Sequence, residues 1–217
     1  MRKTRALLLL ITIALVLALW YSLYAKNLIY DAVVLFGAYI KDSIAGVLIF
    51  IFLAALSAML SPLSSVPLVP LSLVIWGPFL TSLMLLLGWL IGGIAAYAIG
   101  LKFGYPLVSS FIPHEKIDKW SRQLERKVSI FLVLAFRIMT PSETGYIFGI
   151  LKYPFLVYVL VTLLSELPFA FVISYAGSAI LEKERQIFWL LAIASAAFLA
   201  LVYQAYRWEF KRIAAGK

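Results

Sequence analysis

The chain contains no cysteine and only one histidine, His114, among its 217 residues. Without cysteine there is no disulfide framework, no thiolate nucleophile and no cysteine-ligated metal. A single histidine also excludes a metal centre built on a histidine pair. The sequence therefore predicts neither a metal site nor a cofactor.

Charged residues are scarce as well. They make up 13% of the chain, against about 25% in an average soluble domain, whereas 64% of the residues are hydrophobic. This composition is typical of a polytopic integral membrane protein. The net charge of +9 fits basic loops on the cytoplasmic side of a membrane better than a nucleic-acid surface. We therefore expect membrane lipids, and no nucleic acid, as partners.

The motifs of intramembrane hydrolases are missing too. The chain has no Gly-x-Ser-x-Gly nucleophile motif and no His-Glu-x-x-His metalloprotease motif. An intramembrane aspartyl protease would need two aspartates within the membrane, but Asp31, Asp42 and Asp118 all lie in polar segments. We therefore do not expect an enzyme.

Apolar runs long enough to cross a bilayer, about 20 residues, define the spans. The run at 6–24 follows a basic start and ends in aromatic residues, which favours a retained helix over a cleaved signal peptide. We expect 1–42 to form this helix and an interfacial segment, and 186–217 to form a C-terminal transmembrane helix and basic tail. Two further spans are predicted at 79–103, where Gly88-x-x-x-Gly92 favours close helix packing, and at 154–181.

Two other apolar segments contain proline and are expected to be broken. In 43–77, three prolines and four serines fall within twelve residues, and in 128–151 Pro141 is followed by two glycines. Such residues interrupt helices, so we predict a hairpin of two short helices in each segment. The predicted backbone breaks, including one within the later span, are Pro62, Pro67, Pro70, Gly77, Gly145, Gly149 and Pro168.

The distribution of charge predicts the topology. The polar stretch 102–127 has six basic and three acidic residues, and the tail from Arg207 has four and one. Both fall on the cytoplasmic side if the termini are cytoplasmic and each broken segment returns to the side it entered. At 24 residues, 128–151 is too short for two spans, which favours a re-entrant hairpin. For 43–77 the sequence leaves open a re-entrant or a nearly spanning course.

The stretch 114–127 has the pattern of a basic amphipathic helix. Ile117, Trp120 and Leu124 recur at helical spacing and lie largely opposite the basic residues. We expect this helix to rest on the cytoplasmic membrane surface and attract anionic lipid, or else to be a solvated connector.

The predicted fold is an all-α polytopic membrane protein. Two inverted re-entrant helical hairpins are each followed by a transmembrane helix, and further transmembrane helices stand at both ends of the chain. Inverted repeats with paired broken helices place a transport site near the bilayer midplane.

The ordered residues of 44–181 resemble the DedA/VTT membrane-protein family, also called the SNARE-associated Golgi protein family. The resemblance rests on Pro70-x-Ser72 to Gly77, Gly88, Gly92, Tyr97, Gly100, Lys102 and Gly104, and on Arg137-x-x-x-Pro141 to Gly149, Phe155, Pro168, Tyr175 and Gly177. It predicts a DedA/VTT-like domain at 43–181. It also implies lipid translocation, by a flippase of polyprenyl-phosphate carriers or a phospholipid scramblase, and the bacterial members of the family imply a dependence on the proton-motive force.

The chain departs from the family at its acidic and basic positions. Many bacterial members carry a second arginine after the proline and an acidic residue in the first hairpin, and this chain has neither. It has Glu166 where the family often has glycine before Leu-Pro. The resemblance therefore moves the acidic groups to Glu143 and Glu166.

Three ionisable residues lie within predicted membrane segments, and such residues are functional candidates. Arg137 offers a planar fork of donors suited to phosphate, and Glu143 and Glu166 are the expected proton-coupling residues. The predicted substrate-binding residues are Arg137, Thr140, Pro141 and Ser142 in the second hairpin and Ser61, Ser64, Ser65 and Ser72 in the first. Two structural alternatives remain, an Arg137–Glu143 ion pair and a Glu166 that satisfies backbone near Pro168.

The predicted function is a flippase or scramblase for a phosphate-headed lipid, with protons as the coupling partner. The inverted hairpins do not specify the cargo, so a proton- or ion-coupled transporter of a small solute is an alternative. A non-transporting membrane scaffold is another. Assembly into a homo-oligomer is left open by the sequence.

Overall fold

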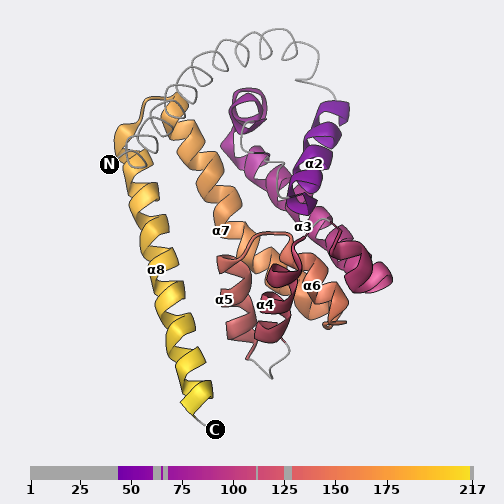
Figure 1. Cartoon of the computed structure of the whole chain (residues 1–217). Helices are drawn as coiled ribbons and strands as arrows, with labels where there is room; N and C mark the ends of the chain where they lie inside the picture. Colours follow the sequence, from indigo (N-terminus) through magenta and orange to yellow (C-terminus); the bar gives the residue numbers. More distant parts are fainter. Residues whose placement is uncertain (1–43, 61–64, 66–67, 111, 125–128, 216–217) are drawn as a thin grey trace, which may run out of the picture. The chain divides into compact units, whose positions relative to one another are not determined.

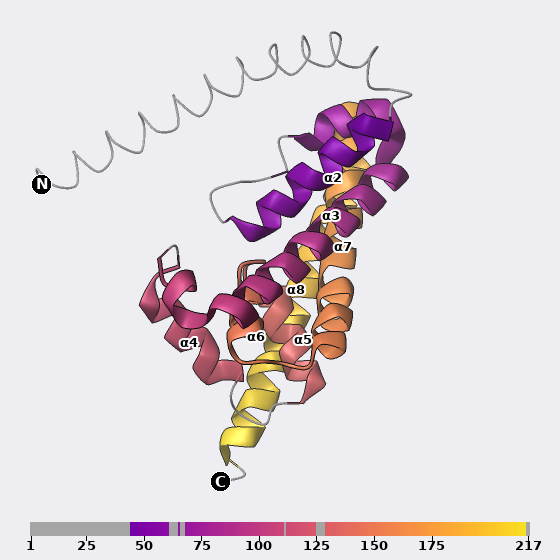
Figure 2. The same ribbon diagram turned by 90° about the vertical axis from the view of Figure 1, so that its right-hand side faces the viewer.

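The computed structural model describes residues 44–60, 65, 68–110, 112–124 and 129–215. All regular structure in these ranges is helical (Figures 1 and 2). The helices are α2 (Ile44–Met59), α3 (Val69–Val108), α4 (His114–Leu124), α5 (Ile130–Met139), α6 (Thr144–Ile150), α7 (Phe155–Leu181) and α8 (Arg185–Ala215). The predicted first transmembrane helix and interfacial segment, 1–42, lie outside the described residues.

Helix α3 is divided by two glycines with positive φ. Gly77 has φ 76° and Gly104 has φ 64°, a region that glycine enters without a steric penalty. The long middle part, 78–103, matches the predicted span, and the break at Gly77 is confirmed. Pro70 was predicted as a break but lies in the first turn of α3. Its missing N–H costs nothing there, so it starts a helix instead.

The glycines in the middle of α3 allow α2 to approach closely. A Cβ atom on Gly88 would lie 2.5 Å from Cβ of Ala54, and one on Gly92 would overlap the backbone carbonyl of Ala55. No larger residue fits at either position without moving the helices apart. The predicted packing role of Gly88 and Gly92 is confirmed.

The second broken segment folds as α5 and α6 (Figures 1 and 2). Helix α5 packs on α7 and α8, whereas α6 packs on α3. The Ser129 hydroxyl caps α5 by accepting from the Leu132 N–H at 3.3 Å. Thr140 then turns extended, with φ −117° and ψ 154°, because the residue before a proline avoids the helical region. The interruption at Pro141 is confirmed, and a re-entrant course through the membrane stays a prediction.

Gly145 and Gly149 were predicted as backbone breaks, and this is wrong, since both lie inside α6. They serve close packing instead. A Cβ atom on Gly149 would overlap the Tyr97 carbonyl of α3, and one on Gly145 would lie 3.2 Å from Cβ of Ala96. A glycine in the sequence can indicate either a helix break or close helix packing, and the local sequence does not distinguish the two.

Helix α7 runs unbroken from Phe155 to Leu181. The predicted interruption at Pro168 is therefore wrong, because the neighbouring turns keep helical backbone around the proline. Among the described residues, α3, α7 and the Arg185–Trp208 part of α8 are long and apolar enough to cross a membrane. The span predicted at 79–103 lies within α3, the span predicted at 154–181 begins one residue before α7, and the C-terminal helix predicted within 186–217 corresponds to α8.

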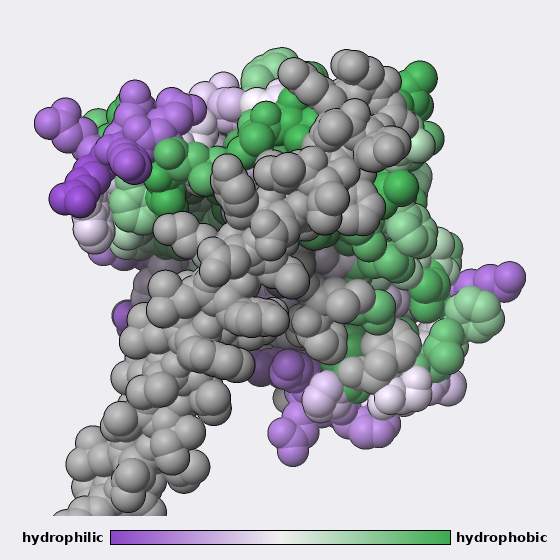
Figure 3. Space-filling view, turned by 90° about the horizontal axis from the view of Figure 1, so that it is seen from above, coloured by the Kyte–Doolittle hydropathy of each residue, from purple (hydrophilic) through white to green (hydrophobic). Residues whose placement is uncertain are grey.

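The surface of these helices is apolar. Leu190 of α8 is 67% exposed, as expected of a side chain that faces lipid. Figure 3 shows apolar side chains over the upper and right-hand parts of the coloured surface, with hydrophilic ones gathered in separate patches at its margins. The composition and the surface agree on an integral membrane protein.

Helix α4 covers most of the predicted amphipathic stretch, whose last residues lie outside the described ranges. Its apolar side chains Ile117, Trp120 and Leu124 are buried in a cluster that also contains Phe148 and Tyr158. The apolar face therefore packs on protein, whereas its sequence pattern predicts that it rests on a bilayer. Lys116 and Lys119 stay exposed on the other face.

Candidate functional site

Arg137 lies in the last turn of α5, and its side chain is only 1% exposed. Its Nη2 donates to Oε1 of Glu166 on α7 at 2.9 Å. Within the described residues this is the one ion pair. Its Nη1 lies 3.5 Å from the Pro141 carbonyl oxygen, at the edge of hydrogen-bonding distance. Arg137 thus ties the second broken segment to the long helix that follows it.

Glu166 is also contacted from the turn between α5 and α6. The Ser142 hydroxyl donates to the same Oε1 atom at 3.3 Å. Neither structural alternative from the sequence matches this arrangement. Arg137 pairs with Glu166 and not with Glu143, and the Glu166 carboxylate accepts from side chains, not from backbone around Pro168.

Helix α3 closes the site at Gly93. A Cβ atom there would lie 3.0 Å from the Tyr158 hydroxyl, 3.4 Å from the Thr162 methyl group and 4.0 Å from Arg137 Nη2. The Tyr158 hydroxyl donates to the Gly93 carbonyl at 2.8 Å. Three helices, α3, α5 and α7, therefore meet around the guanidinium group.

Gly93, Tyr158 and Thr162 were not among the predicted site residues. The signal that could have found two of them is spacing, because Tyr158, Thr162 and Glu166 recur every four residues and so share one face of α7. All three are buried. A buried polar stripe on an otherwise apolar helix marks the face that meets a polar site.

Two polar atoms of the site make no hydrogen bond within the described protein. They are Arg137 Nε and Thr162 Oγ1, both buried. A buried polar group without a partner costs about 1–3 kcal/mol, so native proteins keep few of them. The site therefore has spare hydrogen-bonding capacity on the same arginine that holds Glu166.

The hydroxyl groups beside Pro141 donate hydrogen bonds to backbone carbonyls at the helix interruption. Thr140 Oγ1 donates to the Phe136 carbonyl at 2.8 Å, and Thr144 Oγ1 donates to the Pro141 carbonyl at 2.9 Å. Such bonds replace those that a helix break leaves open. Of the predicted second-hairpin residues, Pro141 and Ser142 thus contact the Arg137–Glu166 pair, while Thr140 stabilises the turn.

The serines of the first broken segment are engaged elsewhere. Ser65 accepts from Trp89 Nε1 at 3.2 Å, and the Ser72 and Thr81 hydroxyls are 2.7 Å apart. These hydrogen bonds join Ser65 and Ser72 to residues of α3, and neither bond involves Arg137. Ser61 and Ser64, and the predicted breaks Pro62 and Pro67, lie outside the described residues.

A different residue links the two broken segments. The Tyr146 hydroxyl of α6 donates to the Met59 carbonyl at the end of α2, at 3.1 Å. Glu143 lies one turn before Tyr146, at the N-terminus of α6, and is only 6% exposed. The second acidic candidate therefore sits near this link between the segments, whereas Glu166 sits on the arginine.

Buried charged groups between apolar, membrane-length helices place the chain in the class of polytopic membrane proteins with an intramembrane polar site. The family model of the VTT domain matches residues 61–179, which include the whole Arg137–Glu166 site, and the chain belongs to this SNARE-associated/DedA family. No curated protein and no solved structure matched the chain. The predicted family is confirmed, and its members are generally membrane proteins proposed as transporters or flippases.

Proposed function

We propose that this protein is a flippase or scramblase that moves a phosphate-headed lipid between the two leaflets. In this proposal the phosphate group of the lipid binds to the Arg137 guanidinium group. There it replaces the Glu166 carboxylate as the partner of Arg137. The observation that carries the proposal is the buried Arg137–Glu166 pair with an unpaired donor, Nε, on the same guanidinium group.

A stabilising role alone does not account for this pair. Removing two charges from water costs several kcal/mol per ion, and well-packed apolar residues of similar volume are often as stabilising as a buried pair. Here the guanidinium group is also incompletely hydrogen-bonded. A phosphate could take the Nε and Nη donors together, since a guanidinium fork matches phosphate oxygens.

Phosphate binding would change the charge balance around Glu166. Two anions on one guanidinium group repel each other, so the phosphate and the carboxylate would compete for Arg137. A protonated Glu166 can still accept from the Ser142 hydroxyl, 3.3 Å away, while its charge no longer competes for Arg137. Arrival of the phosphate and uptake of a proton are then linked, which supports proton coupling through Glu166.

Apolar grooves along the helices that carry the site favour a lipid over a small solute. One groove of about 370 Å³ lies between α5, α7 and α8, the first two of which carry Arg137 and Glu166. A second groove, of about 240 Å³, runs between α7 and α8 and shares Pro168 and Phe198 with the first. Hydrocarbon chains suit such a lining, which is made by Phe131, Leu134, Ala135, Ile138, Leu164, Pro168, Phe198 and Val202.

The test is translocation of a labelled phospholipid or polyprenyl phosphate by the full-length protein in vesicles. Arg137→Lys keeps the charge but loses the fork, and Arg137→Ala loses both, so we expect a large loss with Lys and a larger one with Ala. Arg207→Lys, an exposed position on α8, is the matched control and should leave the rate unchanged.

Two outcomes would contradict the proposal. If both Arg137 variants move lipid at the wild-type rate, the phosphate contact is not Arg137. If the wild-type protein moves a water-soluble phosphate ester into the vesicles but no lipid, the alternative of a small-solute transporter is the better one.

A further inference from the structure

The turn between α7 and α8 has an unusual residue at its closing position. The Glu184 N–H donates to the Ala179 carbonyl at 2.8 Å, and the Lys183 N–H donates to the Ile180 carbonyl at 3.3 Å. These two bonds form a Schellman motif, whose closing residue adopts left-handed backbone and is usually glycine. Here it is Lys183, with φ 62°. A lysine therefore stands where glycine would cause less strain.

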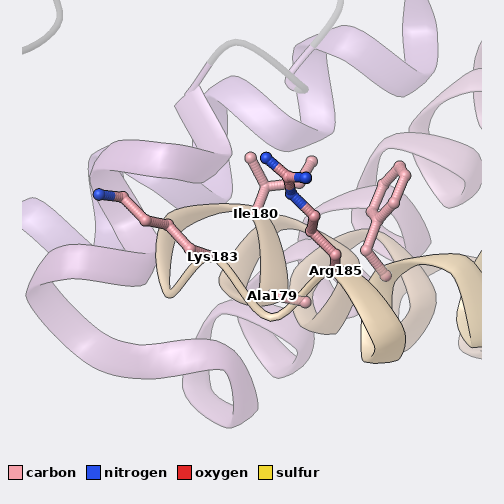
Figure 4. A pocket seen from close by; sticks show the side chains of 5 residues that line it. Ala179, Ile180, Lys183 and Arg185 are labelled. Carbon is pink, nitrogen blue, oxygen red and sulfur yellow. The ribbon is translucent and has the colours of Figure 1, made fainter.

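Lys183 lines a pocket of about 370 Å³ together with Arg185, the first residue of α8. The remaining lining is apolar and comes from Ala179, Ile180 and Phe188. Figure 4 shows the Arg185 guanidinium group close to Ile180, with Lys183 extending from the other side of the turn. The pocket therefore combines two cationic groups with an apolar floor.

Two carboxylates neighbour these cations in sequence without cancelling them. Glu182 accepts from the Ser178 hydroxyl at 2.6 Å, which holds its carboxylate against α7. Glu184 is exposed, and the charged residues that line the pocket are Lys183 and Arg185. The pocket itself is thus positively charged.

The position of the turn indicates what the pocket meets. It joins two helices that are each long and apolar enough to cross a membrane, so it lies at the boundary between hydrocarbon and water. Trp189, in the first turns of α8, is 61% exposed, as is usual for aromatic residues at that boundary. At this depth the surrounding groups are lipid headgroups and the first carbons of acyl chains.

We infer that the α7–α8 turn binds an anionic phospholipid. Arg185 and Lys183 contact the headgroup phosphate, and Ile180 and Phe188 contact the adjoining acyl carbons. Lys183 lies 17 residues beyond Glu166 along the chain, and the part of α7 from Glu166 to Leu181 is about 22 Å long. The lipid site is therefore separate from the Arg137 site and does not depend on the proposed transport.

The test uses the full-length protein in neutral detergent, with thermal unfolding followed as phosphatidylglycerol or phosphatidylcholine is added. We expect Tm to rise with phosphatidylglycerol and much less with phosphatidylcholine, because a ligand that binds only the folded state raises stability. In Lys183→Gly and Arg185→Gln, the phosphatidylglycerol concentration needed for a given rise should increase about tenfold, the effect of losing one charge-assisted hydrogen bond.

Lys183→Gly separates a lipid contact from a structural role. Glycine is the residue that the motif favours, so without lipid this variant should unfold at the wild-type Tm or above it. Lys152 is a matched control, since it closes α6 through the same motif with φ 51°. Lys152→Gly should keep the full phosphatidylglycerol effect.

Three results would overturn the inference. The first is an equal loss of the phosphatidylglycerol effect on Tm in Lys152→Gly and Lys183→Gly, which would mean that the net charge of the protein alone determines lipid binding. The second is an unchanged phosphatidylglycerol effect in both pocket variants. The third is an equal rise in Tm with inorganic phosphate, which would make the pocket a site for free anions.

Discussion

In both halves of the described chain a broken helical segment is bonded to the long helix that follows it, but the bonding groups differ between the halves. In each, a broken helical segment precedes a long apolar helix, 78–103 in the first half and α7 in the second. In the first half the segment is bonded to its helix by two neutral hydroxyls, Ser72 and Thr81, 2.7 Å apart. In the second half the bond is the charged one between Arg137 and Glu166. Charge, and with it the capacity for anion and proton chemistry, is concentrated in the second half.

The breaks themselves also differ. The first half turns on Gly77, whose positive φ is a property of the backbone and needs no side chain. The second half turns at Pro141, and hydroxyls of Thr140 and Thr144 satisfy the carbonyls around it. The first break is therefore fixed locally, whereas the second depends on side-chain hydroxyls next to Pro141, whose carbonyl oxygen lies 3.5 Å from Arg137 Nη1. This difference makes the second half the better candidate for a moving part.

Breaking the charged bond from one side should have the largest effect. In Glu166→Ala, Arg137 stays buried without a counter-charge, and we expect a loss of about 3–5 kcal/mol in unfolding free energy. Replacing both partners, Arg137→Met with Glu166→Leu, should cost much less, because no charge then remains in the core. Denaturation of the purified protein in mild detergent measures both.

A double variant that is as unstable as Glu166→Ala would contradict this account. The ion pair would then itself stabilise the fold, beyond avoiding an unpaired buried charge. Both variants should be inactive in lipid translocation. Activity in the double variant would separate the transport site from the ion pair.

The second largest effect should come from the glycines that bring α6 against α3. Gly149→Leu introduces a side chain onto the Tyr97 carbonyl, and overpacking of this kind costs about 1–3 kcal/mol or more. Gly92→Leu is its first-half counterpart against Ala55 and should cost a similar amount. The measurement is the thermal midpoint in detergent.

The control for these glycines is Gly104→Ala, where a Cβ atom has room, with Pro106 Cδ at 3.8 Å, although φ is 64°. It should cost about 1–2 kcal/mol through backbone strain alone. If Gly149→Leu is as mild as this, α6 does not depend on close contact with α3.

The sequence predicted the long helices and both interruptions because hydropathy, Gly77 and Pro141 act locally. It failed where one residue type has two uses. Gly145 and Gly149 carry the same signal as a break, and only the approach of α3 shows that they pack. In the same way, only the packed cluster shows that the apolar face of α4 is covered by protein.

The partner of Arg137 could not be predicted for a related reason. Glu143 is six residues away in sequence and Glu166 is 29 residues away. Nearness along the chain favoured Glu143, but the packing of α5 on α7 selects Glu166. The family resemblance pointed to Arg137 and marked both acidic positions as departures, without deciding between them.

The pH dependence of transport distinguishes these two carboxyl groups. Glu166→Gln keeps an oxygen that can accept from Arg137 and Ser142 but cannot titrate, so we expect a slower rate that no longer varies with pH. Glu143→Gln should keep the wild-type pH dependence. The measurement is lipid translocation in vesicles over a series of pH values. The reverse pattern, with Glu143→Gln losing its pH dependence, would assign the proton to Glu143.

The smallest expected effect comes from removing one matched hydroxyl in each half. Ser72→Ala and Ser142→Ala each lose one hydrogen bond, of about 1 kcal/mol, to Thr81 and Glu166 respectively. Their thermal midpoints should therefore fall by similar small amounts. Only Ser142→Ala should change the pH at which translocation is half-maximal, because only Ser142 bonds to the carboxylate that exchanges with phosphate. An equal change in Ser72→Ala would show that the first half shares the proton chemistry and that the contrast between the halves is one of geometry alone.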